Sequence, residues 1–137
     1  MKSKPKVELS IPIIPDMELA AIQTAEVVAK HMNLSEEKRG EISMALIEAC
    51  INAFEHSKTK EDQIAINFVI EDETLVIQVT DQGVGFDSSK VKIPKIEQKI
   101  NADRKRGWGL KLIQELMDTV EFESSDEGTT VTMTKKK

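Results

Sequence analysis

The sequence predicts an α+β fold: a two-layer sandwich in which helices pack on one face of a mixed, mostly antiparallel sheet. Apolar residues alternate in five short segments and follow the helical period in three others. Short polar turns join two pairs of the alternating segments, so hairpins predominate and the strands pair mostly antiparallel. The chain has 137 residues, of which 39% are hydrophobic. We expect one domain over residues 1–137 with its own core.

The N-terminal part is predicted to form one strand and two helices. Apolar residues alternate at the start of residues 7–14, which predicts a strand, and Pro12 favours an edge position. Asp16 follows a proline and is predicted to cap the first helix. Ser35 is predicted to cap the second helix, which runs to about His56. The expected buried face of that second helix consists of Ile42, Leu46, Ala49 and Ala53.

The remaining elements are two hairpins on either side of a third helix. Residues 64–70 and 75–80 alternate in polarity and are joined by a turn at residues 71–73. A third helix is predicted from Gly107 to Asp118 and should turn its apolar side inward. The second hairpin spans residues 120–133, and the lysines that follow it, up to Lys137, are expected to be solvated.

The composition excludes several classes of protein. With 24 acidic residues against 19 Lys and Arg, the net charge of −5 argues against broad, unaided binding to a nucleic-acid backbone. No apolar run approaches the roughly 20 residues that span a bilayer, and the N-terminus does not resemble a secretory signal. The single cysteine excludes an internal disulfide and a cysteine-based zinc site. We therefore expect a cytoplasmic protein without membrane contact.

One polar cluster falls on the second predicted helix. Glu48, Asn52 and His56 are spaced i, i+4 and i+8, so they project from one side of that helix, away from its apolar face. A carboxylate and an amide one turn apart can order a water, a hydroxyl or a hydrated magnesium ion. On spacing alone, a solvated polar face is the more common reason for such a pattern.

Two glycine clusters follow or precede regular elements. Asp81 ends a strand and is followed by Gly83 and Gly85, which permit positive φ and close approach of another molecule to the backbone. Residues 107–110 (Gly-Trp-Gly-Leu) open the third helix, where free N–H groups and the helix dipole favour an anion. Taken alone, each cluster is as typical of an ordinary glycine-rich turn or flexible helix start as of a binding site.

Between the glycine clusters lies a basic segment over residues 86–106. It holds seven Lys and Arg and three acids, a balance of +4 in an otherwise acidic chain. A basic, glycine-hinged loop is suited to close over a polyphosphate. Arg104 and Arg106 are nearest to the second glycine cluster and are the candidates for direct phosphate contacts.

Taken in order, these clusters resemble the motifs of the GHKL ATPase superfamily, which includes gyrase, heat-shock chaperone, histidine kinase and mismatch-repair ATPases. Glu48-Ala-Cys-Ile-Asn52-Ala is similar to the N box, and residues 81–86 and 107–110 are similar to the two glycine boxes. Gly128-Thr129-Thr130-Val131 resembles the strand that completes the adenine pocket. The length and these motifs together are most similar to the bacterial anti-sigma-factor serine kinases.

The resemblance implies ATP and Mg²⁺ as cofactors and a role for each matching residue. Glu48 would be the general base, and Asn52 would coordinate the magnesium ion. Asp81 would accept a hydrogen bond from the adenine amino group, with support from Thr130. Residues 86–106 would form a flexible ATP lid. The other implied nucleotide contacts are Gly83, Gly85, Gly107, Gly109 and Leu110, while Trp108 would either cover the nucleotide or fill apolar surface.

For the whole protein, the resemblance implies an ATP-dependent serine/threonine kinase that phosphorylates a small anti-anti-sigma (STAS-type) partner. It also implies an anti-sigma factor that binds a sigma factor and regulates transcription by partner switching, and a homodimer. Two alternatives to such a kinase stay open at this point. The first is an ATP-binding interaction module without kinase activity, and the second is a detached catalytic domain of a histidine kinase.

Overall fold

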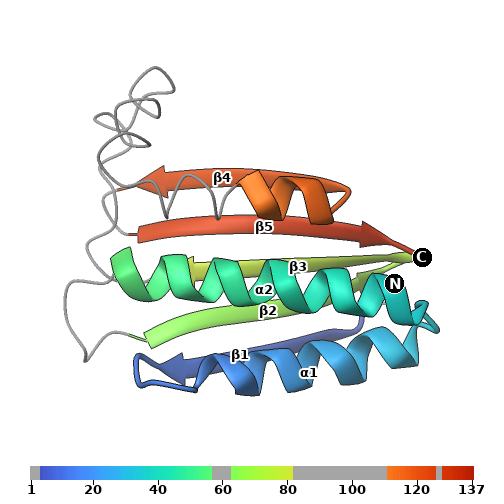
Figure 1. Ribbon diagram of the computed structural model, residues 1–137, viewed down its shortest axis with the longest axis horizontal. Coiled ribbons are helices and arrows are strands. Elements are labelled where there is room, and N and C mark those ends of the chain that lie inside the picture. The colour runs from blue at the N-terminus through green and yellow to red at the C-terminus, as the bar shows by residue number, and fades with distance from the viewer. Residues whose placement is uncertain (1–3, 57–62, 82–110, 126–127) are drawn as a thin grey trace.

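The computed structural model describes residues 4–56, 63–81, 111–125 and 128–137. Residues 111–116 form a helical segment between strands β3 and β4. The labelled elements, in chain order (Figure 1), are β1 (Lys6–Pro12), α1 (Glu18–His31), α2 (Glu36–His56), β2 (Gln63–Glu71), β3 (Thr74–Asp81), β4 (Thr119–Ser125) and β5 (Gly128–Lys136). The predicted glycine boxes and the basic segment over residues 86–106 lie outside the described residues, apart from Asp81 at the end of β3.

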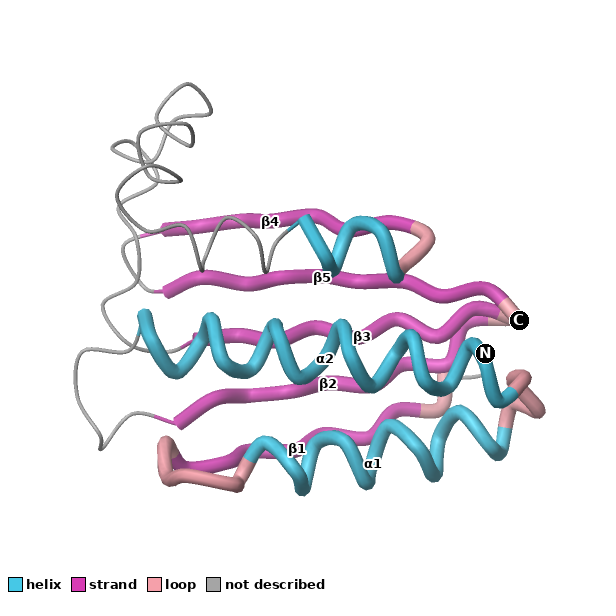
Figure 2. The backbone as a smooth tube through the Cα atoms, viewed as in Figure 1, coloured by secondary structure: helices cyan, strands magenta, loops and turns pink. Residues whose placement is uncertain are grey.

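The described strands form a five-stranded sheet in the order β1-β2-β3-β5-β4. Each of its four pairings is antiparallel. The last strand, β5, therefore lies between β3 and β4. Helices α1 and α2 and the helical segment 111–116 cover the same face of this sheet (Figures 1 and 2). The predicted α+β sandwich with helices on one face is confirmed.

The core lies between the helices and the sheet, as the alternation of apolar residues requires. Ile66 and Phe68 of β2 and Ile77 of β3 are almost completely buried, because every second residue of a strand points to the same face. The predicted apolar face of α2 is also buried; it consists of Ile42, Leu46, Ala49 and Ala53. Removal of this apolar surface from water is the main favourable contribution to folding.

The two predicted helix caps have different outcomes. Ser35 caps α2 as predicted, because its Oγ accepts a hydrogen bond of 3.2 Å from the backbone N–H of Lys38. The prediction for Asp16 is wrong: Met17 occupies the N-cap position and α1 begins at Glu18. Asp16 has a φ of 77°, in the left-handed region, whereas an aspartate that caps a helix typically has a β-region backbone conformation.

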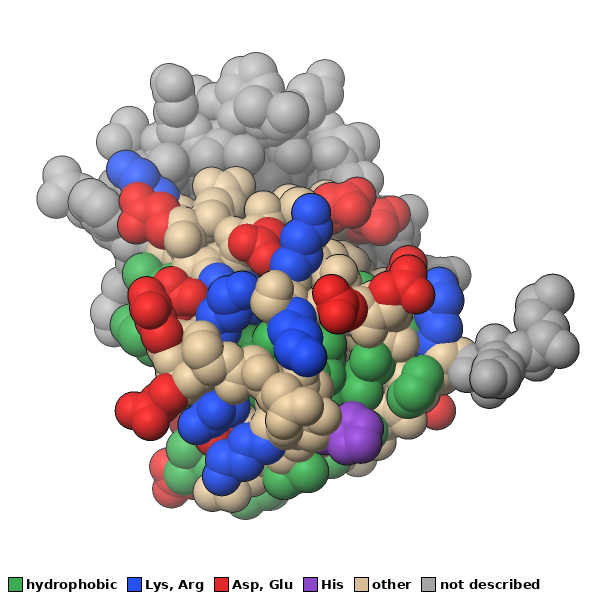
Figure 3. Space-filling model, turned by 90° about the vertical axis from the view of Figure 1, so that its right-hand side faces the viewer, with side chains coloured by type: hydrophobic (Ala, Val, Ile, Leu, Met, Phe, Trp, Pro, Cys, Tyr) green, Lys and Arg blue, Asp and Glu red, His purple; other side chains and the backbone are tan. Residues whose placement is uncertain are grey.

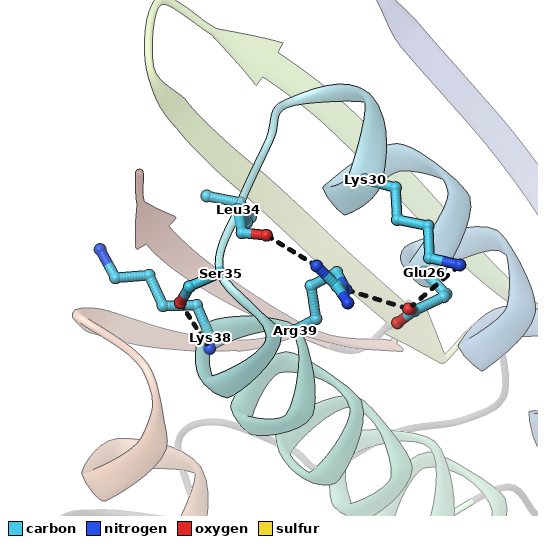
Figure 4. Close-up of polar contacts among 6 residues, drawn as sticks. All are labelled: Glu26, Lys30, Leu34, Ser35, Lys38 and Arg39. Carbon is cyan, nitrogen blue, oxygen red and sulfur yellow. Dashed lines mark hydrogen bonds and ion pairs between the residues drawn. The ribbon is translucent and has the colours of Figure 1, made fainter.

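Polar contacts fix the turn between α1 and α2 (Figure 4). Arg39 donates one hydrogen bond of 2.9 Å to the backbone oxygen of Leu34 and another of 3.0 Å to Glu26. Lys30 lies 3.8 Å from the same Glu26 oxygen atom. One guanidinium thus satisfies a loop carbonyl and joins the start of α2 to the last turns of α1.

The C-terminal lysines differ from the prediction of a solvated tail. Lys135 is only 6% exposed, and its Nζ lies 2.8 Å from Oε1 of Glu41 on α2. The physical reason is that β5 extends to Lys136, so the inward alternation of Val131 and Met133 continues to Lys135. Lys136 and Lys137 are exposed, as predicted.

At the end of the molecule that carries the α1–α2 turn, acidic and basic side chains are interspersed (Figure 3). Such mixed charges produce short-range ion pairs rather than an extended field of one sign. Among the residues that the structure describes, no helix is both long and apolar enough to cross a membrane.

Candidate functional site

The candidate site lies where the C-terminal half of α2 meets the ends of β3 and β5. Asp81 is the last residue of β3, and it pairs in register with Thr129 at the start of β5. Asn52 reaches the same pocket from α2. The complete lining of this pocket is Ala49, Asn52, Ala53, Val79, Asp81, Phe122, Thr129 and Val131. Three polar residues thus converge on a small cavity whose other walls are apolar.

These three polar side chains are buried. Asp81 is 1% exposed, Thr129 5% and Asn52 7%. A buried polar group destabilises a protein unless it is hydrogen-bonded. Among the residues that the structure describes, the Nδ2 atom of Asn52 has no hydrogen-bond partner. A ligand in this pocket can supply one.

The structure places Thr130 outside the pocket. Its side chain points to the face of the sheet that the helices leave uncovered, where its hydroxyl lies 3.1 Å from that of Thr80. The preceding residue, Thr129, lines the pocket. We therefore assign the hydroxyl beside Asp81 to Thr129 in place of Thr130. The sequence signal for this assignment is the inward position of Val131 and Met133. Every second residue of a strand faces the same side, so Thr129 faces inward with them.

Glu48 lies one turn before Asn52 on α2 and is partly buried. It does not line the pocket itself, but the i, i+4 spacing places it on the same side of the helix as Asn52. A carboxylate in this position has access to solvent and is adjacent to the pocket. This is the arrangement that a group needs in order to take a proton from an approaching hydroxyl.

Cys50, between these two residues in the chain, faces the opposite way and is completely buried. Burial, with a smaller contribution from the charge of Glu18, raises the pKa of its thiol from 9.0 to about 12. The thiol is therefore protonated at neutral pH and belongs to the core.

Within the described part of the chain, no group of three or more His, Cys, Asp or Glu side chains could hold a metal ion by itself. The donors present suit magnesium that arrives with a nucleotide. Such magnesium keeps several waters and binds mainly to the phosphates, with one or two oxygen atoms from the protein. The amide oxygen of Asn52 is a suitable protein ligand at this pocket.

The other predicted site residues lie outside the described residues and remain predictions. They are Gly83, Gly85, Arg104, Arg106, Gly107, Trp108, Gly109 and Leu110. Among the pocket residues without a predicted role in the site, Phe122 of β4 is the aromatic one. Phe122 is 41% exposed, and no motif distinguishes it from an ordinary strand residue.

Comparison with known proteins agrees with this geometry. Residues 15–135 match the family model of the histidine kinase-like ATPase domain. The chain belongs to this family. Among curated relatives, serine-protein kinase RsbW of Bacillus cereus is 36% identical over 136 residues, which cover 95% of this chain and 84% of the relative. RsbW of Bacillus thuringiensis subsp. konkukian is 35% identical over the same shares. The resemblance to GHKL serine kinases is thereby confirmed.

Two solved structures share this fold at low sequence identity. The RsbU and RsbW domains of Rv1364c from Mycobacterium tuberculosis superpose with a TM-score of 0.71 at 16% identity, over 96% of this chain. This chain spans only 32% of that longer protein. The catalytic domain of histidine kinase ThkA gives a TM-score of 0.58 at 15% identity, over 99% of this chain and 98% of that domain.

Proposed function

We propose that this histidine kinase-like ATPase domain is a serine/threonine protein kinase. It binds ATP with Mg²⁺ in the pocket of Asn52, Asp81 and Thr129. One observation carries the proposal: a carboxylate that is 1% exposed shares a mostly apolar pocket with Thr129 and with the Nδ2 atom of Asn52, which has no partner within the described part of the chain. The similarity to serine-protein kinases over nearly the full chain supports the same activity.

Asp81 and Thr129 recognise the base of the nucleotide. The side chain of Asp81 accepts a hydrogen bond from the exocyclic amino group of adenine, and the Thr129 hydroxyl binds the same edge directly or through a water. Guanine presents a carbonyl oxygen where adenine has its amino group, so the carboxylate repels it. The flat apolar walls, including Val79 and Phe122, contact the faces of the ring.

Asn52 and Glu48 act at the phosphate end. The amide oxygen of Asn52 would hold the magnesium ion, which would neutralise charge on the phosphates. The Glu48 carboxylate takes the proton of the substrate hydroxyl as its oxygen bonds to the γ-phosphorus and the bond to the leaving ADP oxygen breaks. By the family resemblance, Gly83 and Gly85 would border the base, Gly107, Gly109 and Leu110 would border the phosphates, and Trp108 would cover the nucleotide. Arg104 and Arg106 contact the phosphates from the segment 86–106.

The partners follow from the same family relationship. We propose that the phosphorylated substrate is a STAS-type anti-anti-sigma protein and that the chain is an anti-sigma factor that binds a sigma factor. Transcription regulation then depends on which partner is bound. We further propose a homodimer in the cytoplasm, with neither nucleic acid nor membrane as a partner. The net charge of −5 supports the part that concerns nucleic acid.

The proposal is tested by calorimetric titration of ATP with and without Mg²⁺ on the wild type and on Asp81→Asn. Loss of a hydrogen bond to a charged group costs about 1.5–3 kcal/mol, so we expect affinity to fall roughly 10- to 150-fold. Asp72→Asn is the matched control, since Asp72 lies exposed in the β2–β3 turn at the other end of β3. Equal affinities for ATP in all three proteins would overturn the adenine pocket, as would equal binding of ATP and GTP to the wild type.

The similarity to the ThkA domain favours a second candidate, a histidine-kinase catalytic domain. The two candidates differ in the bond they form. A phosphorylated serine partner keeps its label in acid and loses it in base, whereas phosphohistidine is acid-labile. Radiolabel that survives acid on a partner protein supports the serine kinase, and acid-labile label supports the alternative.

A further inference from the structure

An exposed apolar surface lies along the outer side of α2, opposite the stripe that packs on the sheet. Four residues at helical spacing form it: Met44, Ile47, Ile51 and Phe54. Met44 is 51% exposed and Ile51 is 37% exposed. A helix that packs only on a sheet needs one apolar stripe. The second stripe on α2 is therefore available to a neighbouring helix or to a partner.

The first turns of α1 border this stripe. Glu26 of α1 accepts a hydrogen bond from Arg39 of α2, so this side of α1 faces α2. Leu19 lies on the same side, because it is seven residues before Glu26. The two helices run antiparallel and side by side (Figure 1). Leu19 therefore lies beside the C-terminal half of α2, and it is 51% exposed.

The apolar surface ends in an open pocket between the β1–α1 loop and α2. This pocket has a volume of about 430 Å³ and is lined by Ile13, Ile14, Pro15 and Phe54. Ile14 is 51% exposed. The volume is sufficient for a large apolar side chain, such as the anchor residue of a partner. We call the whole surface the helix seam; it consists of Ile14, Leu19, Met44, Ile47, Ile51 and Phe54.

The charged side chains around the helix seam are acidic. Residues 7–29 and 40–56, which include the whole seam, contain no Lys or Arg. Asp16 and Glu55 are exposed at its pocket end, and Glu48 lies near its middle. The basic residues of the α1–α2 turn are at the other end of the helices, where they are interspersed with acidic ones (Figure 3). Cationic side chains on a partner would complement this acidic rim.

We propose that the helix seam binds an amphipathic helix of a partner protein, whose apolar stripe is flanked by Lys and Arg. Such a helix presents apolar residues at the same spacing as the stripe on α2, so the two pack by interdigitating side chains. A second copy of this chain does not fit, because it would place like carboxylates opposite one another. The inference does not depend on ATP binding, since no residue of the seam lines the pocket of Asn52, Asp81 and Thr129.

The test is fluorescence anisotropy of a labelled peptide of about 18 residues, in which Leu forms one helical stripe and Lys occupies the other positions. The full chain should bind it at least about tenfold more tightly than a scrambled peptide of the same composition. Leu19→Gln and Ile51→Gln should each weaken binding about fivefold, because each removes a partly exposed apolar side chain from the contact. Val27→Gln is the matched control and should stay within about twofold of the wild type. Val27 is 68% exposed and directly follows Glu26, so it points away from α2. Gln favours a helix, and thermal unfolding shows that each variant is folded.

Three results would overturn the inference. The first is equal binding of the patterned and scrambled peptides, or equal weakening by Val27→Gln and Leu19→Gln. The second is that a peptide with Glu in place of Lys binds as tightly as the Lys peptide, which would exclude a basic partner. The third is self-association of the wild type in sedimentation experiments that Leu19→Gln and Ile51→Gln abolish. That outcome would assign the helix seam to a second copy of this chain.

Discussion

Replacing Thr129 by Val tests which face of β5 forms the nucleotide pocket. The two side chains have nearly the same shape, so the change removes a hydroxyl and leaves the strand packing largely intact. Thr129 is 5% exposed, so water compensates little for the lost group. A net hydrogen bond contributes about 0.5–1.5 kcal/mol, which corresponds to roughly a 2- to 13-fold weaker affinity for ATP.

Thr130→Val is the matched control at the next residue. It removes the hydroxyl that lies 3.1 Å from Thr80 on the uncovered face of the sheet. We expect its affinity for ATP to stay within about twofold of the wild type, because that hydroxyl is outside the pocket. Calorimetric titration with ATP·Mg²⁺ measures both affinities, and thermal unfolding shows that both variants are folded.

The opposite pattern would refute this reasoning. If Thr130→Val weakened ATP binding and Thr129→Val did not, the outward residue would be the one that contacts the nucleotide. The first residues of β5 would then have to alternate out of phase with Val131 and Met133 when ATP is bound. Equal, small effects of both variants would show that the base is recognised by Asp81 without a threonine.

Two further predictions concern α2. Glu48→Gln should lower the rate of phosphoryl transfer about 10²- to 10⁴-fold and leave the affinity for ATP nearly unchanged. Glu37→Gln, at the exposed start of the helix, is the control. Single-turnover assays with a partner protein measure the transfer rate, and an unchanged rate would exclude Glu48 as the base. The pKa of Cys50, about 12 instead of 9.0, predicts that iodoacetamide labels the native protein at pH 8 at least roughly 100-fold more slowly than the protein in urea. The native thiol stays protonated at pH values where the unfolded thiol ionises. The contribution of Cys50 to the free energy of unfolding is therefore complete below pH 9 and is lost as the pH rises towards 12. Fast labelling of the native protein would contradict the buried position of Cys50.

The fold was predictable because the apolar periods are regular. Strands β2 and β3 bury every second residue, and α2 buries the stripe that its 3.6-residue period indicates. The site was predictable in part, because Asp81 and Asn52 are recognised by type and by their place at the end of a strand and on a helix. Their convergence follows only from the packing of α2 over β3, which no local pattern encodes.

Asp16 shows a different limit. An aspartate just before a helix favours the capping position, but the chain has to turn sharply from β1 into α1. The left-handed backbone at Asp16 makes part of that turn and places Met17 at the cap instead. Tertiary geometry overrides the local preference here, because the direction of the chain between two packed elements is fixed by both.

The alternation of β5 explains the positions of both Thr129 and Lys135. Every second residue of β5 from Thr129 to Lys135 faces the helical side of the sheet. The same alternation therefore places the pocket hydroxyl of Thr129 and the buried ammonium of Lys135 on that side. Shifting the register of β5 by one residue would expose both groups together with the apolar residues between them. Because β5 pairs with β3 on one side and β4 on the other, such a shift would disrupt two ladders at once. The nucleotide end and the Lys135 contact are therefore held in phase by the same strand.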